Sequence, residues 1–258
     1  MSGESQEMSF WDHLDVLRKS LIRSAIFVGL TSVILFFFKD FLFDTIIFAP
    51  TRGDFWLYRL LGVDFNLQLI NIDVAAQFTT HIRITFIAAL IVSVPYLVYE
   101  IWKFVSPALF QHEKAAIRGG FMFAAVLFYV GAAVGYFIVL PLMLNFFADY
   151  QVSELVSNTF SLKSYIGLFA SSVLLFGLVF EFPTIIIVMS SMGLVTRGTL
   201  KQYRKHAICG VVILAAVITP SGDPFSLFVV SIPLYFLYEF SILICRKGKE
   251  EPEEEQDI

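Results

Sequence analysis

The sequence has few of the side chains from which metal centres and covalent active sites are usually built. Its 258 residues include two cysteines, and Cys209 and Cys245 both lie within or at the edge of apolar stretches. This placement favours simple packing over a disulfide framework of the secreted type. The four histidines are scattered, and no phosphate-binding loop, metal-ligand spacing or nucleophile motif accompanies them. We therefore predict a protein without a metal, a cofactor or enzymatic activity.

Charged residues are also scarce, at 16% of the chain, whereas 57% of the residues are hydrophobic. The mean hydropathy of +0.77 is far above that of soluble domains and indicates an integral membrane protein. Six apolar blocks can be distinguished, at residues 21–38, 80–102, 120–147, 165–192, 207–219 and 224–245. Because these blocks are continuous rather than alternating, they predict helices and exclude the strands of a closed barrel. The predicted fold is all-α, with six transmembrane helices in residues 1–245.

The six blocks differ in length, and two of them contain an internal proline. Only 17 residues separate Lys205 from Asp223, which gives a helix of roughly 25 Å. The third and fourth blocks are longer and contain Pro141 and Pro183, each of which removes a backbone hydrogen bond and favours a kink. Unequal, bent helices predict a concave, cupped bundle rather than a compact cylinder.

The distribution of basic residues predicts the orientation in the membrane. The two termini and the second and fourth connections hold 13 of the 18 basic residues. These are Arg18, Lys19, Arg23, Lys103, Lys114, Arg118, Arg197, Lys201, Arg204, Lys205, Arg246, Lys247 and Lys249. By the positive-inside rule we expect both termini in the cytoplasm, in a multi-pass protein of the cytoplasmic (inner) membrane. Residues 246–258 form an acidic tail that we expect to be disordered.

One carboxylate stands alone in the apolar stretch GLVFEFPTIIIV. Glu181 is the only charged residue between Ser164 and Thr196. Ionisable side chains at membrane depth are costly and commonly mark a functional site. A purely structural alternative is a buried acid that is hydrogen-bonded to hydroxyl groups such as those of Ser171, Ser172 or Thr184. A functional alternative is a proton-coupled carrier of small solutes, with Glu181 and Asp223 as proton relays.

The second cytoplasmic connection contains a helix-start signal followed by an acid. Ser106 and Pro107 are favourable residues at an N-cap and a first helical position, so ALFQHEKAA is predicted to be a short surface helix that presents Glu113. The two oxygens of a fixed carboxylate match the planar fork of a guanidinium group. Alternatively, Glu113 is an ordinary solvated acid beside Lys114.

Four fragments together resemble one family. They are FWDHLDVLRKSL before the first helix, IWKFVSPALFQHEKAAI after the second, FEFP in the fourth and ITPSGDPFS before the last. Their order and spacing resemble the TatC family, the multispanning core of the twin-arginine protein translocase, over essentially the whole chain. The resemblance implies a receptor that binds the twin-arginine signal peptides of folded precursors. It also implies assembly with single-span subunits of the TatA and TatB type, in homo- and hetero-oligomers, and transport driven by the proton-motive force.

The resemblance also implies roles for particular residues. Glu113 matches the family glutamate of the PALxxHE motif that contacts the twin arginines. The amino-terminal motif usually reads His-Leu-x-Glu-Leu-Arg, but its glutamate is replaced here by Val16. Asp12, about one helical turn before Val16, and Asp15 are the candidates to replace it, although Asp12 could equally cap the first helix.

Three further residues match family positions. Glu181 matches a position that makes a polar contact with helices of the partner subunits. Asp223 matches an acid of the outer turn, although TPSGD is one residue longer than the common TPPD, and a helix-capping role is equally compatible with the sequence. Pro50 matches a proline of the first outer connection, where its simplest role is to fix a bend. A membrane scaffold or insertase subunit without transport activity is a further alternative.

Overall fold

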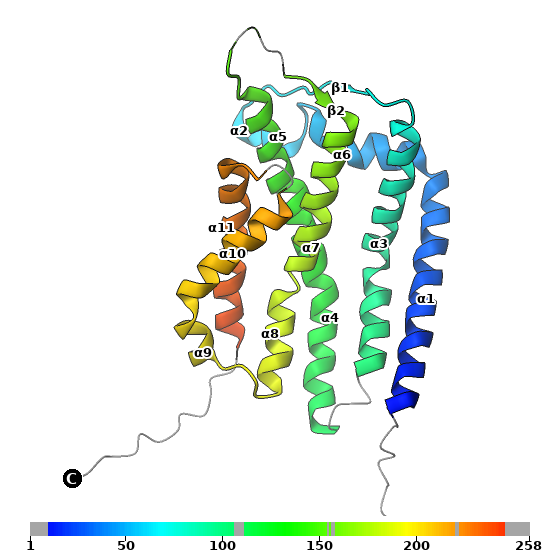
Figure 1. Ribbon diagram of the computed structural model, residues 1–258, viewed down its shortest axis with the longest axis vertical. Coiled ribbons are helices and arrows are strands. Elements are labelled where there is room, and N and C mark those ends of the chain that lie inside the picture. The colour runs from blue at the N-terminus through cyan, green and yellow to red at the C-terminus, as the bar shows by residue number, and fades with distance from the viewer. Residues whose placement is uncertain (1–9, 106–110, 154, 156–157, 220–221, 246–258) are drawn as a thin grey trace, which may run out of the picture.

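The structure is a computed structural model that describes residues 10–105, 111–153, 155, 158–219 and 222–245. The side chains of Phe10, Asp12, Val105 and residues 111–121 lie outside this description. The described chain is an upright bundle of helices in which α1 begins and α11 ends at the same end (Figure 1). We call this the terminal end and the opposite end the loop end.

Within the described residues, five helical segments are long and apolar enough to cross a membrane. The first two are α1 (Phe10–Phe37) and α3 (Ala76–Val105), and the fifth is α11 (Pro224–Ile244). The third combines α4 (Gln111–Val134), η4 (Gly135–Val139) and α5 (Leu140–Asp149). The fourth combines α6 (Leu162–Ala170), η5 (Ser171–Leu175), α7 (Phe176–Val179) and α8 (Phe182–Ser191). The all-α membrane fold predicted from the sequence is therefore confirmed.

The remaining predicted span corresponds to α10 (Arg204–Ile218), a helix of 15 residues. At a rise of about 1.5 Å per residue it reaches only about 22 Å, less than the roughly 30 Å thickness of a bilayer core. Helix α10 follows the short helix α9 (Arg197–Gln202) and packs against α11. The six predicted helices are thus found, with one of them shorter than a normal membrane span.

The third and fourth spans are interrupted where the sequence places proline. A π-helical segment, η4, ends just before Pro141, which occupies the first turn of α5. In the fourth span, α7 ends at Val179 and α8 begins at Phe182, with Pro183 in its first turn. A proline in a first turn needs no hydrogen-bond donor, so α8 restarts where the missing N–H costs least, whereas the third span stays helical from η4 through Pro141.

These two spans approach each other closely through glycine. A Cβ atom at Gly135 would lie 2.0 Å from the carbonyl oxygen of Ser172, and one at Gly131 would lie 2.6 Å from the carbonyl oxygen of Phe176. The pair forms a Gly-x-x-x-Gly spacing on one face of the third span, which allows backbones to come together without side chains between them. The fourth span, which carries Glu181, is therefore held firmly against the third.

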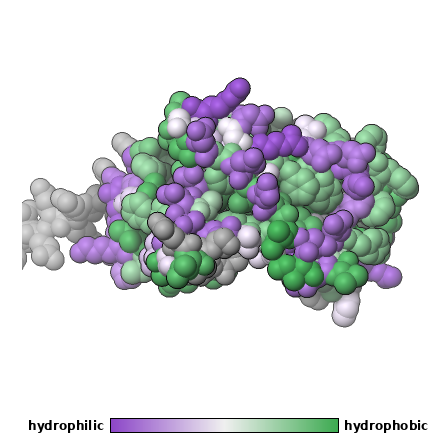
Figure 2. Space-filling view, turned by 90° about the horizontal axis from the view of Figure 1, so that it is seen from above, coloured by the Kyte–Doolittle hydropathy of each residue, from purple (hydrophilic) through white to green (hydrophobic). Residues whose placement is uncertain are grey.

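The loop end is closed by the first outer connection. This connection contains η1 (Phe41–Ile47), η2 (Ala49–Thr51) and α2 (Trp56–Leu61), and its strand β1 (Leu69–Ile70) pairs in parallel with β2 (Phe160–Ser161), Leu69 opposite Phe160. Three tyrosine hydroxyls donate hydrogen bonds to its backbone carbonyls: Tyr58 to Pro50, Tyr136 to Ile46 and Tyr165 to Ile47. Figure 2 shows hydrophilic side chains spread over much of this end, with hydrophobic ones between them.

Candidate functional site

Three of the carboxylates singled out in the sequence belong to helices that begin at the terminal end. Asp12 and Asp15 lie in the first turns of α1, and Glu113 lies in the first turn of α4. The side chain of Asp15 is exposed, whereas those of Asp12 and Glu113 lie outside the described residues. Helix α3 packs against both α1 and α4, and Figure 1 shows the start of α1, the end of α3 and the start of α4 side by side.

One prediction for this region needs correction. ALFQHEKAA was expected to form a short surface helix separate from the third span. Gln111–Ala116, the part of this fragment that the structure describes, instead forms the beginning of α4 and continues without a break into the membrane segment. The expected start at Ser106 and Pro107 lies outside the described residues. Glu113 is therefore carried by the end of a long helix, which continues through Gly119 and Gly120 into the apolar block although glycine is a weak helix former.

Helix α1 is held to the bundle by one seam along α3. His13 stacks on Phe104 with ring centroids 4.3 Å apart, and Phe27 stacks on Tyr96 at 4.3 Å. Near the loop end, Phe36 stacks on His81 at 4.1 Å. The rest of α1 is largely exposed, as expected for a face in contact with lipid acyl chains.

The centre of this seam is a polar cluster that sequence reasoning missed. Glu100 of α3 is only 4% exposed, and Arg23 of α1 donates to it twice, from Nε at 2.9 Å and from Nη2 at 2.7 Å. The hydroxyls of Ser20 and Tyr96 donate to the same carboxylate, at 2.5 Å and 2.9 Å. The signal in the sequence was an acid inside the second apolar block, but its partner is 77 residues away on another helix.

The seam also explains the surroundings of Val16. Residues three and four apart lie on the same helix face, so Val16 shares the α3-facing side of α1 with His13 and Ser20. Both of these contact α3, at Phe104 and at Glu100 respectively. The position at which the family motif has its glutamate thus lies against α3, one turn away from the Glu100 carboxylate.

Glu181 lies at the break between α7 and α8. It occupies the N-cap position of α8, where the helix dipole favours a negative charge, although its side chain makes no capping hydrogen bond. Its Oε1 atom is buried and, within the described part of the chain, has no hydrogen-bond partner of normal geometry. The neighbouring Thr184 Oγ1 is also unpaired within that part, and Ser171 donates to the carbonyl of Leu168 instead. Within the described residues, therefore, no hydrogen bond of normal geometry joins the carboxylate to the hydroxyl of Ser171 or Thr184, although Thr184 lies close enough to interact with it.

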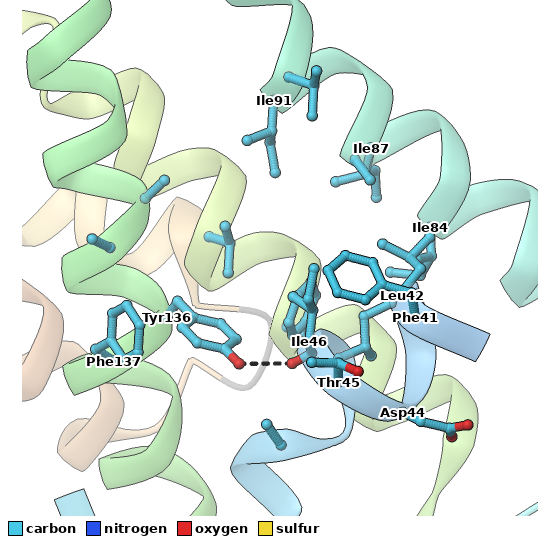
Figure 3. Close-up of a pocket in the computed structure, with 18 of the residues that line it drawn as sticks. Phe41, Leu42, Asp44, Thr45, Ile46, Ile84, Ile87, Ile91, Tyr136 and Phe137 are labelled. Atoms are coloured by element: carbon cyan, nitrogen blue, oxygen red, sulfur yellow. Dashed lines mark hydrogen bonds between the residues drawn. The ribbon is translucent and has the colours of Figure 1, made fainter. Parts of the chain in front are cut away.

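A large apolar cavity lies nearer the loop end, between α3, the third span and the first outer connection. Its volume is about 1010 Å³, and Figure 3 shows Ile84, Ile87 and Ile91 of α3 along one wall and Tyr136 and Phe137 across from them. The hydroxyl of Tyr136 donates to Ile46 at 2.7 Å and so needs no further partner. Glu181 is not part of the lining.

The two outer residues have structural roles. Asp223 is the N-cap of α11, where its Oδ1 accepts a hydrogen bond of 2.8 Å from the backbone N–H of Ser226. Pro50 is buried in η2, directly after the π-helical segment η1, and its carbonyl accepts the hydrogen bond from Tyr58 at 2.9 Å. The capping role considered for Asp223 and the bend expected at Pro50 are thus both found.

These features define the class of protein: a polytopic helical membrane protein with carboxylates on helix ends at one face and an unpaired acid at a helix break inside the bundle. A family model described as Sec-independent protein translocase protein (TatC) matches residues 12–233. The chain belongs to this family.

Named relatives and solved structures agree with this assignment. The Sec-independent protein translocase protein TatC of Blattabacterium sp. subsp. Periplaneta americana is 40% identical, over 95% of this chain and 97% of its own length. That of Escherichia coli strain K12 is 30% identical, over 93% and 91%. A crystal structure of the twin-arginine translocase receptor TatC is 31% identical and superposes with a TM-score of 0.74, over 90% of this chain and 97% of its own. A second crystal structure of that receptor, in the detergent DDM, gives 0.76.

The capping geometry predicts how Asp223 responds to substitution. Asp223→Asn keeps a side-chain oxygen that can accept from the Ser226 N–H, whereas Asp223→Ala removes the cap and should cost about 0.5–2 kcal/mol. We therefore expect the alanine variant to unfold at a lower temperature in detergent while the asparagine variant stays close to the parent protein. If both variants were equally stable but export failed in both, the charge of Asp223 would have a function beyond capping.

Proposed function

We propose that this protein is the multispanning receptor subunit of a twin-arginine translocase, which binds the signal peptides of folded precursors. The observation that carries the proposal is the family match over residues 12–233, together with the likeness to crystal structures of the twin-arginine translocase receptor. The proposed partners are twin-arginine signal peptides and single-span subunits of the TatA and TatB type. Export of folded cargo is driven by the proton-motive force.

The proposed signal-peptide site is the terminal end of α1 and α4. Two guanidinium groups require acceptor oxygens in fixed positions, and carboxylates provide them in the matching geometry. Glu113 supplies the principal carboxylate, and Asp12 supplies the second, with Asp15 as the next candidate. The placement of α1 and α4 on either side of α3 supports this arrangement. Glu100 is not available as a substitute, because four donors already occupy its two oxygens.

This assignment predicts an order of effects on precursor binding. Glu113→Gln should weaken binding most, Asp12→Asn should weaken it less, and Asp15→Asn least. Each variant loses one charged acceptor, and the order follows the proposed contribution of the three carboxylates to binding. The measurement is the affinity of the purified protein for a fluorescent signal peptide. A peptide with both arginines changed to lysine is the control, and it should bind weakly to every variant. Full binding by both aspartate variants would show that Glu113 alone reads the arginine pair.

The orientation that we propose places both termini in the cytoplasm. Support comes from the 13 basic residues near the termini and the two connections on the same side, and from the common end at which α1 starts and α11 finishes. In this orientation Arg197 to Gln202, the helix α9, lies on the cytoplasmic side, and the β1–β2 pair lies outside. The proposed site for the signal peptide then faces the compartment in which precursors are made.

Cysteine labelling tests the orientation directly. Ser153, near the loop end, and Thr199, in α9, are both exposed, and the natural thiols are removed by Cys209→Ala and Cys245→Ser. A membrane-impermeant maleimide applied to intact spheroplasts should label Ser153→Cys and spare Thr199→Cys. Permeabilised membranes provide the control, because both sites should then react. The opposite pattern would reverse the proposed topology.

Glu181 is proposed to contact a helix of a single-span partner subunit. A buried carboxylate oxygen without a partner in the described part of the chain supports this role, because an unsatisfied polar group in a membrane interior is costly until a second chain provides a donor. The break between α7 and α8 also leaves the carbonyl of Val179 without its usual helical donor, because Pro183 has no N–H. The position thus offers acceptors to an incoming polar side chain.

The carrier alternative is not favoured. Its two proposed relay groups were Glu181 and Asp223, but Asp223 is engaged in capping α11. The family and the relatives are protein translocase components, which also sets aside the hypothesis of a solute carrier.

Substitution of Glu181 separates folding from partner contact. Glu181→Ala should leave the protein inserted and close to the parent in stability, because no hydrogen bond of normal geometry within the described part is lost, while reducing crosslinks to the single-span subunits and export. Glu181→Gln should lose less if hydrogen bonding rather than charge matters. The matched control is Thr184→Val, which removes a neighbouring hydroxyl without removing a carboxylate. Normal crosslinking and export by Glu181→Ala would contradict the proposed contact.

A further inference from the structure

We propose that Arg23 and Glu100 are positioning residues for the twin-arginine site: their ion pair fixes the rotation and height of α1 on α3, and thereby the place of the α1 carboxylates relative to Glu113. This inference rests on the proposed function. It concerns two residues that do not touch the signal peptide, and it assigns a purpose to the buried acid that the sequence motifs leave unexplained.

Apart from this ion pair, helix α1 has little to hold it in place. Its principal contacts are with α3, and Figure 1 shows it at the edge of the bundle. Ring stacking at His13, Phe27 and Phe36 holds α1 against α3, but stacked rings tolerate sliding and tilting. A bidentate ion pair is directional, because two N–H groups must meet two oxygens in one plane. The ion pair therefore fixes the position of α1 along and around α3, which the stacking contacts alone do not fix.

The Glu100 carboxylate has no free acceptor position. Its Oε1 accepts from Arg23 Nε and from the Tyr96 hydroxyl, and its Oε2 accepts from Arg23 Nη2 and from the Ser20 hydroxyl. Each oxygen thus has two donors, and the residue is 4% exposed. A carboxylate that is saturated and covered in this way holds its neighbours in place and offers no acceptor to an incoming arginine.

A movement of α1 at the ion pair is transmitted along the helix to the proposed site. Asp15 lies two turns, about 12 Å, from Arg23 along the same rigid helix. Because side chains extend about 5–6 Å from the helix axis, a rotation of α1 by 30° would move its carboxylate by about 3 Å. That displacement equals a whole hydrogen-bond length, so a loss of the ion pair should misplace Asp12 and Asp15 without any change in those residues.

The molecule contains a matched control for this pair. In α10 and α11, Arg204 donates to Glu239 at 2.6 Å, and Tyr235, one turn before Glu239, donates to it at 3.1 Å. The same three residue types thus join two helices, as they do at Arg23, Glu100 and Tyr96. Neither α10 nor α11 carries a residue of the proposed signal-peptide site. Loss of this second pair removes an interhelical ion pair without disturbing α1.

The experiment measures site geometry and peptide binding in the same variants of the full-length protein in detergent. The seam variants are Arg23→Gln, Glu100→Gln and the milder Tyr96→Phe, and the control variant is Arg204→Gln. Spin labels at the exposed positions Lys19 and Met122, on α1 and α4, report the distance between the two helices by pulsed electron resonance. Affinity is measured with a fluorescent twin-arginine peptide and with its twin-lysine counterpart, and thermal unfolding checks that each variant is folded.

We expect Arg23→Gln and Glu100→Gln to broaden the distance distribution and to weaken twin-arginine binding about tenfold. Tyr96→Phe should have a smaller effect of the same kind, and it keeps the test open if a stronger variant does not fold. The charge swap of Arg23→Glu with Glu100→Arg should recover at least part of the affinity. Arg204→Gln should change neither measurement, although it should lower the unfolding temperature.

Two results would overturn the inference. A narrow distance distribution with unchanged binding in the folded seam variants would show that the ion pair does not position α1. Tighter binding by Arg23→Gln, together with lost binding by Glu100→Gln, would show that Glu100 itself binds the arginines of the signal peptide and that Arg23 competes with them. Failure of the proposed function looks different, because the parent protein would then bind the twin-arginine and twin-lysine peptides equally while the distance measurement still reported on α1.

Discussion

Every polar group that a bilayer would surround must find a partner inside the protein, and this requirement decides where the bundle bends and where it carries charge. The third span changes from π-helix to α-helix just before Pro141, and the fourth is broken just before Pro183, which lies in the first turn of α8. At the loop end, the irregular segments η1 and η2 pass over the bundle. There the hydroxyls of Tyr58, Tyr136 and Tyr165 satisfy their carbonyls. Irregular backbone is tolerated because the neighbouring spans supply its hydrogen bonds.

The same requirement distinguishes the acids of the described helices from one another. Glu100 and Glu239 each have an arginine and a tyrosine as partners within the chain. Glu181 has a buried oxygen without such a partner in the described residues, at the start of α8. A saturated acid joins helices, whereas an unsatisfied one inside the bundle stabilises the protein only when another group reaches it. Satisfaction of hydrogen bonds, rather than the mere presence of charge, therefore separates structural acids from functional candidates.

Most of the fold could be predicted from the sequence, because a membrane span depends on the length and hydropathy of its own segment. The six apolar blocks, the breaks at Pro141 and Pro183 and the short span after Lys205 all follow from length, hydropathy and the missing proline N–H. The cap formed by Asp223 could be anticipated for the same reason, since donor and acceptor are three residues apart. The short helix expected around Glu113 was wrong in its boundary, because α4 runs on through Gly119 and Gly120, residues that by propensity alone favour an end of the helix.

The interactions between distant segments could not be read in the same way. The acid at Glu100 is visible in the second apolar block, but its pairing with Arg23 depends on which faces of α1 and α3 meet. The pairing of β1 with β2 joins two outer connections that share no pattern. The close approach at Gly131 and Gly135 likewise needs a partner surface, here the backbone of Ser172 and Phe176. Each of these features requires knowledge of helix rotation, which hydropathy alone does not supply.

The α1–α3 seam links the departure from the family motif to the buried ion pair. Val16 shares the α3-facing side of α1 with Ser20, whose hydroxyl donates to Glu100. A glutamate at position 16 would bring a second carboxylate within a turn of Glu100, where burial makes like charges costly. Valine brings no charge to that position, and Arg23 is left to neutralise one acid instead of being shared between two. The acids available to a ligand on α1 are then those nearer its start, Asp12 and Asp15.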